Sequence, residues 1–436
     1  MQFASRASNR WWRRKMTRRY AWLTLVVIAG CSLPDSSVTP ASEPFTAVEG
    51  NRGELVVGGV QACARRGGGF WCWGMNDDTG FRKSDAIACP DRLFCETASR
   101  VRELDGAVQV AFELVGKACL VSGAGQLWCR GAVTGSARGD SVISTTRWLF
   151  DAPVVEVALG GGYLCVRHPN GAVSCWGDVI FTGGPAPAHP RYVPGLTDAT
   201  QLAAGSQHAC ALRRGGTVVC WGSNRVGQLG VEKDPPCPSG QVGAACALVP
   251  SQVEGLGDVA EIVAGAYFTC ARQRSGAVFC WGVDQMGELG ESTAGTCDPP
   301  LLPIGRAACS RSPLRVRGVD AVRIASGSHH SCAVEANGHV VCWGSNLLGE
   351  LGASLSEHCP PTGRYPCSTR PVDVGLTDVV DVAVGGVFMP IGGGYSCAET
   401  RAKEVYCWGT TGEFAPGMEV PFRGPHPSPR KIAFSD

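Results

Sequence analysis

The sequence predicts an all-β protein, a seven-bladed β-propeller in which each blade is a four-stranded sheet. Three observations predict this fold: cysteine pairs recur at a nearly constant spacing, each pair flanks a glycine turn between two β-prone runs, and the unit occurs seven times. Such a period indicates one supersecondary unit repeated along the chain. The seven pairs are Cys63/Cys72, Cys119/Cys129, Cys165/Cys175, Cys210/Cys220, Cys270/Cys280, Cys332/Cys342 and Cys397/Cys407.

The fourth unit shows the expected strands most clearly. Residues 202–212 and 217–222 are apolar and flank a glycine turn, which indicates a hairpin. Residues 223–230 then turn the chain, and residues 250–256 predict a short outer strand before the next unit begins. One four-stranded sheet cannot bury both faces alone, whereas sheets repeated around an axis bury them against one another.

The units share a glycine five residues before the first cysteine, Trp-Gly after the second cysteine, and an Asn-x-x-Gly-x-Leu-Gly turn. These features resemble the regulator of chromosome condensation repeat, which implies a seven-bladed propeller. The turn is complete at residues 224–230 and 346–352, and Asp284 replaces Asn in a third copy. The second unit departs from the pattern, because it lacks both the glycine and the tryptophan.

The C-terminus is expected to close the ring. The first unit has no outer strand before residues 55–57, and residues 429–433 form an outer strand with no inner strand after them. We therefore expect the C-terminal strand to complete blade one, which removes exposed strand edges.

The cysteines of the repeat pairs are predicted to form disulfides. Opposite residues in an antiparallel pair have Cα atoms about 4.5–5.5 Å apart, which is within disulfide range. Export to an oxidising compartment favours the disulfide, and reduced, buried cysteines are the alternative. A zinc site is disfavoured, because the sequence contains no Cys-x-x-Cys and no Cys/His tetrad at zinc spacing.

Four further cysteine pairs predict a binding face. They lie between the Trp-Gly and the next outer strand, in the longest intervals between units, and are Cys89/Cys95, Cys237/Cys246, Cys297/Cys309 and Cys359/Cys367. Insertions at one point of a repeat project from one face of the ring, and loops on a rigid scaffold commonly bind ligands. Decoration that resists proteolysis is the alternative interpretation.

Residues 1–30 are predicted to be a signal peptide of the lipoprotein type. The first twenty residues carry seven basic side chains and no acidic one, and residues 21–30 are mostly apolar. This run is too short to span a bilayer, which takes about 20 residues. The sequence Ile28-Ala29-Gly30-Cys31 resembles a bacterial lipobox, which implies cleavage before Cys31 and a lipid on its sulfur. An ordinary signal peptide is the alternative.

The lipobox resemblance also predicts a location. Cys31 is followed by serine and not by aspartate, which resembles lipoproteins sorted to the outer membrane. We expect an exported protein of a bacterial cell envelope, held by its lipid at the outer membrane or cell surface. Residues 31–48, rich in Ser, Pro and Thr, are expected to form a flexible tether before a propeller at residues 49–436.

A nucleic-acid partner is not expected. Without the seven basic residues near the start, 32 basic residues remain against 38 acidic ones, a net charge of about −6. A chain with no basic surplus lacks the electrostatic footprint of a nucleic-acid-binding protein.

Motifs for catalysis, cofactors and metals are absent. The sequence has no Gly-x-Ser-x-Gly, phosphate loop, dinucleotide fingerprint or His-Glu-x-x-His. Two positions before each first cysteine stand Gln61, Lys117, Tyr163, His208, Phe268, His330 and Tyr395. These side chains are too diverse for a symmetric metal ring. His208 and His330 are expected to make structural hydrogen bonds within their blades, and the repeated tryptophans are expected to pack in the core.

The sequence therefore predicts an envelope-anchored, non-enzymatic binding propeller. We expect a monomer that needs no cofactor and recognises an unidentified protein partner through its looped face. A carbohydrate-active or cell-wall-modifying enzyme, or a lectin, is the main alternative. An inhibitor of a cell-wall enzyme rests on fold-level analogy alone. Guanine-nucleotide exchange, the activity of the founding family member, is disfavoured because an exported lipoprotein would not meet a cytosolic GTPase.

Overall fold

The computed structural model describes residues 55–59, 61–75, 94–113, 117–130, 146–148, 150–177, 189–232, 249–297, 307–355, 357–359, 366–387, 393–409 and 426–435. The chain divides into two compact units, Met1–Thr46 and Ala47–Asp436. Every described residue belongs to the second unit.

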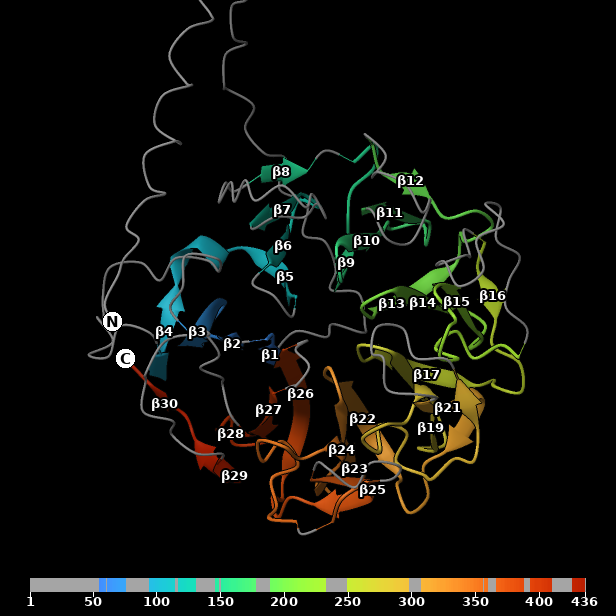
Figure 1. Ribbon diagram of the computed structural model, residues 1–436. Helices are drawn as coiled ribbons and strands as arrows, with labels where there is room; N and C mark the ends of the chain where they lie inside the picture. The colour runs from blue at the N-terminus through green and yellow to red at the C-terminus, as the bar shows by residue number, and fades with distance from the viewer. Residues whose placement is uncertain are drawn as a thin grey trace, which may run out of the picture. The chain divides into compact units, whose positions relative to one another are not determined.

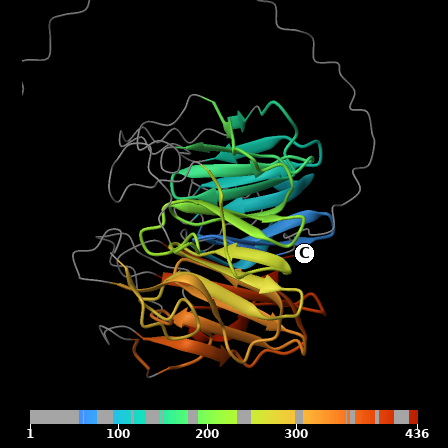
Figure 2. The ribbon, with the colours of Figure 1, turned by 90° about the vertical axis from the view of Figure 1, so that its right-hand side faces the viewer.

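Seven antiparallel sheets surround a common axis (Figure 1), which confirms the predicted seven-bladed propeller. Each blade is built on four strands in chain order, the first nearest the axis and the fourth farthest from it, and the strands run across the thickness of the ring (Figure 2). The blades are β1–β4 (Leu55–Val57, Gln61–Arg66, Gly69–Met75, Phe94–Val101), β5–β8 (Ala107–Phe112, Ala118–Ser122, Leu127–Arg130, Thr146–Trp148), β9–β12 (Glu156–Gly160, Tyr163–Arg167, Val173–Gly177, Arg191–Tyr192), β13–β16 (Ala199–Ala204, His208–Arg213, Val218–Gly222, Ser251–Gln252), β17–β19 with β21 (Val259–Ala264, Phe268–Gln273, Val278–Val283, Ala307–Arg315), β22–β25 (Ala321–Ser326, His330–Glu335, Val340–Ser345, Cys367–Asp373) and β26–β29 (Val379–Val387, Gly393–Thr400, Val405–Gly409, His426–Lys431).

Two blades carry a fifth strand. In blade five, β20 (Thr296–Cys297) pairs with the outer strand β21. In blade one, β30 (Ala433–Phe434) lies parallel to the outer strand β4. A single short 3₁₀ turn, Arg102–Leu104, is the helical element of the described ranges.

The C-terminal strand joins blade one, as predicted, but this strand is β30 (Ala433–Phe434) and most of the residues expected to form it lie elsewhere. Residues 429–433 do not complete blade one: most of this segment belongs to β29, the outer strand of blade seven, where Arg430 lies opposite Cys407. Blade one has its own outer strand, β4. The reason is that each outer strand follows and pairs with the third strand of its own unit. It does not precede and pair with the first strand of the next unit. Only β30 crosses to blade one, as an added strand.

The C-terminal residues secure the contact between blades seven and one. The ring of Phe434 meets Trp71 and Trp73 edge-on, with centroids 6.4 and 6.1 Å apart. The guanidinium of Arg66 lies 3.4 Å from the centroid of Phe434, and its Nη2 donates to the carbonyl of Lys403 in blade seven. A cation–aromatic contact and a hydrogen bond thus hold the last blade to the first.

We call the contact between two neighbouring blades a joint. Buried side chains fill the joints, and five repeated tryptophans are at most 1% exposed: Trp73, Trp221, Trp281, Trp343 and Trp408. These side chains therefore pack in the core, as the sequence predicted.

Side chains of one inner strand also cover the open edge of the next inner strand. Gln201 donates to the carbonyl of Ile262 at 2.7 Å and accepts from its amide at 3.1 Å. Gln109 makes the same two bonds to Val157. A register shift, which is a β-bulge, precedes each of these glutamines and turns its side chain toward the neighbouring blade. Backbone groups that face the axis are satisfied in this way.

Three joints carry a further bond from tryptophan. The indole N–H groups of Trp281, Trp343 and Trp408 donate to the carbonyls of Gln228, Glu288 and Glu350 in the preceding blade, at 3.1, 3.1 and 2.8 Å. By contrast, the buried indole N–H of Trp221 has no hydrogen-bond partner in the described part of the chain.

This difference gives a matched test of the joint. We expect Trp343→Phe to lower the free energy of unfolding by about 1–2 kcal/mol more than Trp221→Phe does. Both changes remove the same atoms from fully buried sites, but only Trp343→Phe breaks a hydrogen bond. Chemical denaturation followed by fluorescence measures both values, and equal losses would contradict the role given to the bond.

Candidate binding face

One face of the ring carries two sets of turns. The turns between first and second strands lie beside the long turns that leave the third strands, because the backbone of one bonds the other. Ser223 N–H donates to the carbonyl of Gln207 at 2.8 Å, and Ser345 N–H donates to that of His329 at 2.9 Å. We call this side the loop face and define it by residues 224–230, 284–290 and 346–352 together with the described ends of the disulfide loops, residues 293–297, 307–309, 357–359 and 366–367.

Nine cysteine pairs are disulfides in the described ranges. Seven join the second and third strands of one blade, with Cα atoms 4.0–4.1 Å apart, and two close loops: Cys63–Cys72, Cys119–Cys129, Cys165–Cys175, Cys210–Cys220, Cys270–Cys280, Cys332–Cys342, Cys397–Cys407, Cys297–Cys309 and Cys359–Cys367. The side chains of Cys31, Cys89, Cys95, Cys237 and Cys246 lie outside the part of the chain that is described.

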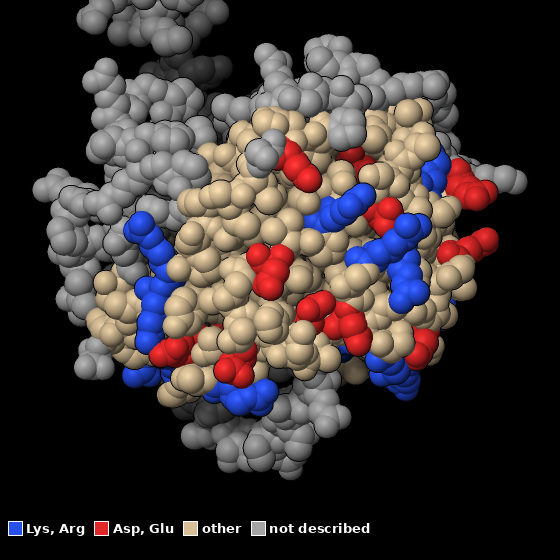
Figure 3. Space-filling model, turned by 90° about the horizontal axis from the view of Figure 1, so that it is seen from below, with Lys and Arg blue, Asp and Glu red and all other residues tan. Residues whose placement is uncertain are grey.

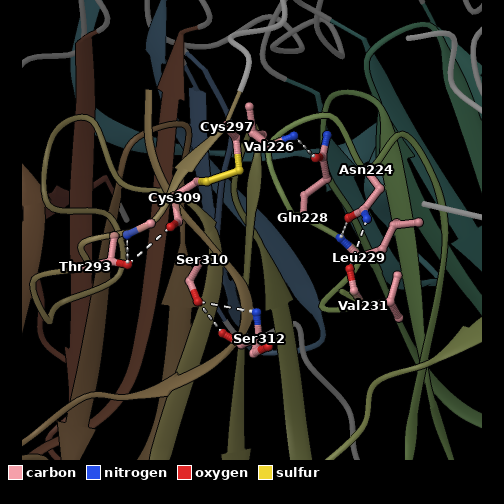
Figure 4. Close-up of a disulfide and its surroundings, with 11 residues drawn as sticks. Asn224, Val226, Gln228, Leu229, Val231, Thr293, Cys297, Cys309, Ser310 and Ser312 are labelled. Atoms are coloured by element: carbon pink, nitrogen blue, oxygen red, sulfur yellow. Dashed lines mark hydrogen bonds between the residues drawn. A yellow bond between two sulfur atoms is a disulfide. The ribbon is translucent and has the colours of Figure 1, made fainter. Parts of the chain in front are cut away.

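The two loop disulfides sit where the sequence placed the insertions. Cys297–Cys309 joins β20 to the outer strand β21, with the Cα atoms 5.9 Å apart (Figure 4). Thr293 Oγ1 donates to the carbonyl of Cys309 at 3.2 Å and accepts from the amide of Gly295 at 3.1 Å. In blade six, Cys359 is likewise linked to Cys367, the first residue of the outer strand β25.

The preceding blade supports the end of each loop. A Cβ atom at Gly227, where φ is +80°, would lie 2.6 Å from the carbonyl oxygen of Ser310, the residue after Cys309. Gly287 packs against Ser368, the residue after Cys367, in the same way. Only glycine permits such close backbone contact at a positive φ. The turn of one blade therefore fixes the base of the disulfide loop on the next blade.

Both supported segments have the same local geometry. Ser310 Oγ donates to the carbonyl of Ser312 at 2.6 Å and accepts from its amide at 3.3 Å (Figure 4). Ser368 makes the equivalent pair of bonds with Arg370. The repetition shows that two blades present their loops on the same scaffold.

The long turns are built around two polar side chains at positions one and five. In blade four, Leu229 N–H donates to Asn224 Oδ1 at 3.0 Å and Val226 N–H donates to Gln228 Oε1 at 3.0 Å (Figure 4). Blade five has Asp284 and Glu288 at these positions, and blade six has Asn346 and Glu350. Their side-chain oxygens accept the corresponding amide protons.

The carboxyl groups of these turns are buried and electrostatically perturbed. Burial raises the pKa of Asp284 to about 8, with the charge of Glu288 adding to the effect. Burial also raises the pKa of Glu350 to about 7. The ring of His329 lies beside them, with Nδ1 3.1 Å from Glu288 Oε1. The turns of the loop face therefore contain a cluster of buried titratable groups between blades five and six.

The residues two positions before each first cysteine do not form a ligand ring. His208 and His330 make structural hydrogen bonds, but the expectation that these bonds stay within one blade is wrong. His208 Nε2 lies 2.8 Å from Thr269 Oγ1, and His330 Nε2 lies 2.9 Å from Ser396 Oγ, each in the next blade. The reason is that both faces of a blade are covered by its neighbours, so a buried polar side chain finds its partner across the joint.

Other residues of this set are also buried or paired within the structure. Tyr163 OH donates across a joint to the carbonyl of Gly205 at 2.9 Å, and Phe268 and Tyr395 are at most 1% exposed. Lys117 forms an ion pair with Glu113 at 3.0 Å, and burial raises the pKa of Glu113. A sequence signal for the partners of His208 and His330 exists, since Thr269 and Ser396 directly precede the first cysteine of their units.

The described residues show no built metal site and no membrane span. They contain no group of three or more His, Cys, Asp or Glu arranged to hold a metal ion. No helix among them is long and apolar enough to cross a membrane. Basic and acidic side chains are interspersed on the side of the ring seen in Figure 3, so this side has no large field of one sign.

The repeated turns of blades four to six match a known repeat family. The profile of the regulator of chromosome condensation (RCC1) repeat matches residues 199–228, 259–288 and 321–350, and a second profile of the same repeat matches residues 215–272 and 275–334. Blades four to six are thus built from RCC1 repeats, and the ring as a whole has the fold of that family.

Relatives share the repeats over part of their length. The mitochondrial RCC1 domain-containing protein RUG3 of Arabidopsis thaliana is 29% identical over 172 residues, 39% of this chain and 33% of that protein. The secretion-regulating guanine nucleotide exchange factor of Bos taurus is 33% identical over 139 residues, 31% of this chain and 27% of that protein. The alignments thus span about a third or less of these relatives.

Solved structures match the whole ring. Yeast RCC1 (Prp20), solved bound to Kap60, superimposes with a TM-score of 0.63 at 20% identity, covering 93% of this chain and 91% of that one. Human WBSCR16 gives a TM-score of 0.56 at 19% identity, over 76% of this chain and 84% of that one. At this identity the likeness shows the fold.

The buried histidines predict sensitivity to acid. Burial lowers the pKa of His208 and His330 to about 3 in the folded state, against an ordinary value of 6.5. Their contribution to stability is present above pH 6.5 and is lost as the pH falls toward 3, because the unfolded chain takes up protons first.

Replacement by phenylalanine, which blade five has at Phe268, tests this origin. His208→Phe with His330→Phe should reduce the loss of stability between pH 7 and pH 4, measured as the change in denaturation midpoint, even if stability at pH 7 falls. A pH dependence as steep as that of the wild type would assign the acid sensitivity to other groups.

Proposed function

We propose that the protein is an envelope-anchored, non-enzymatic propeller that binds a protein partner through its loop face. The observation that carries this proposal is the support of the disulfide loops by the preceding blade, through Gly227 at Ser310 and Gly287 at Ser368. Loops held at their bases lose less conformational freedom on binding than free loops, so more of the contact energy appears as affinity.

A protein is the class of partner that the family favours. Yeast RCC1, which has the same fold, was solved in complex with the protein Kap60. The outer edge of the ring, which Figure 3 shows, carries both signs of charge and has no basic field for a polyanion. We assign this chain a protein ligand on those grounds.

The envelope anchor rests on the N-terminal sequence and on the cysteines. Nine disulfides within the described ranges suit an oxidising compartment outside the cytosol, where such bonds persist. Cys31, the cysteine left without a predicted partner, would then carry the lipid. In the same picture, Cys89 pairs with Cys95 and Cys237 pairs with Cys246.

The anchor is tested by the fate of residue 31. Expression of the full chain in a bacterial host should give a protein that starts at Cys31, carries diacylglycerol on its sulfur and fractionates with membranes. Cys31→Ser should release the protein from the membrane fraction. Mass spectrometry of the N-terminal peptide decides, and an unmodified Cys31 peptide in a mature, exported protein would refute lipidation.

The binding face is tested by paired substitutions on the two sides of the ring. Ala294→Arg and Glu357→Arg place a large cation on exposed positions of the loop face, just before the two disulfide loops. Ser275→Arg and Asn337→Arg do the same at exposed hairpin turns on the opposite face. Cross-linking of the full-length protein in its own cell envelope should capture a discrete protein, and the loop variants should reduce capture about tenfold or more.

The control variants should capture the partner as the wild type does. If both pairs behave alike, the loop face is not the binding surface. If glycan is retained instead of a protein, and the loop variants do not change its retention, the proposed partner class is wrong.

A further inference from the structure

The long turn of the loop face occurs three times with one geometry and different charges. At positions one and five it carries Asn224 and Gln228 in blade four, Asp284 and Glu288 in blade five, and Asn346 and Glu350 in blade six. In all three copies the first side chain accepts the amide proton at position six, and the fifth accepts that at position three. Blade four shows that neutral amides are sufficient for the fold of the turn, so the carboxyl groups of blades five and six are not required by it.

These carboxyl groups lie inside the protein. Asp284 is 5% exposed, Glu288 is fully buried and Glu350 is 1% exposed. A carboxylate that ionises at such a site needs a partner or a bound proton, because burial penalises its charge.

The neighbouring titratable groups give partial compensation. His329, from the first turn of blade six, pairs with Glu288 Oε1 at 3.1 Å, and its charge also favours ionisation of Glu350. Glu350 Oε1 accepts from Ser345 Oγ at 3.3 Å. Asp284 faces the like charge of Glu288, which opposes its ionisation. The next residue in the chain is His330, and burial and the charge of His329 both oppose its ionisation.

The same turns form hydrogen bonds to the next blade, and one of them supports the base of a disulfide loop. The carbonyl of Glu288 accepts a hydrogen bond from the indole N–H of Trp343 at 3.1 Å. The carbonyl of Glu350 accepts two, from the indole N–H of Trp408 at 2.8 Å and from Ser396 Oγ at 3.1 Å. Gly287 supports Ser368 at the base of the loop 359–367. A change in either turn therefore reaches the next blade.

We propose that residues 284–290 and 346–352 make the joints between blades five and six and between blades six and seven responsive to pH. Ionisation of Asp284 and Glu350 loosens these two joints and the base of the loop 359–367, whereas the turn 224–230, which is built on amide side chains, does not respond. This inference does not depend on the identity, or the existence, of a protein partner.

The direction of the response follows from the proton balance. Both carboxyl groups hold their protons more tightly in the folded protein, with pKa values of about 8 for Asp284 and about 7 for Glu350. The stability that they contribute is complete below the pKa of an unfolded carboxyl, near 4, and is lost as the pH rises through 7 and 8. The joints are closed at mildly acidic pH and loosen at alkaline pH.

Hydrogen exchange of the full-length protein tests the inference with an internal control. The amides of Leu229, Leu289 and Leu351 occupy the same place in the three turns. After correction for the intrinsic exchange rate, protection of Leu289 and Leu351 should fall about tenfold between pH 6 and pH 9, whereas protection of Leu229 stays constant.

A variant that replaces the two carboxyl groups named in the inference with amides provides the second readout. Asp284→Asn with Glu350→Gln should make all three turns equally insensitive to pH. The inference is overturned if Leu229 responds as strongly as the other two amides, or if the double variant keeps the wild-type response. If the variant does not fold, the comparison of the three amides within the wild type still decides.

Discussion

The structure depends on the joint between neighbouring blades. Each blade exposes both sheet faces and the edge of its inner strand to its neighbours, so its polar groups must be satisfied across the joint. Gln201 covers the edge at Ile262, His208 bonds to Thr269, and the carbonyl of Gln228 receives the indole proton of Trp281. The contacts that hold the ring also orient the loop face, because the same turns support the disulfide loops.

Sequence patterns within one repeat predicted the blades, but they did not predict the contacts between blades. Cysteine spacing and the Trp-Gly pairs gave the seven units, since hairpin partners such as Cys210 and Cys220 lie ten residues apart. The partners His208 and Thr269 lie 61 residues apart, and no local rule joins them. The residues that close the ring were assigned only in part for a related reason: an outer strand as short as Ser251–Gln252 gives no signal of which neighbour it pairs with.

The sequence predicted the disulfide loops of the candidate site but not its titratable cluster. Extra cysteines marked the insertions, because a disulfide needs two residues of one rare type at a suitable spacing. The titratable cluster was not recognised, because Asp284 reads as a conservative change within the Asn-x-x-Gly-x-Leu-Gly turn and Glu288 occupies a variable position. Their importance comes from burial close to His329, and burial at a joint depends on how two blades dock.

The disulfides strengthen the blades without securing the ring. Each of the seven hairpin bonds closes a segment within one blade, with a separation of nine or ten residues, and each contributes roughly 2–3 kcal/mol on chain-entropy grounds. The two loop disulfides also stay within single blades. Among the described residues, hydrogen bonds, ion pairs and packing cross the joints and no disulfide does, so the ring can loosen at particular joints while its blades remain folded. The buried carboxyl groups of blades five and six lie at such joints, and Gly287 of the same turn contacts Ser368 at the base of a disulfide loop.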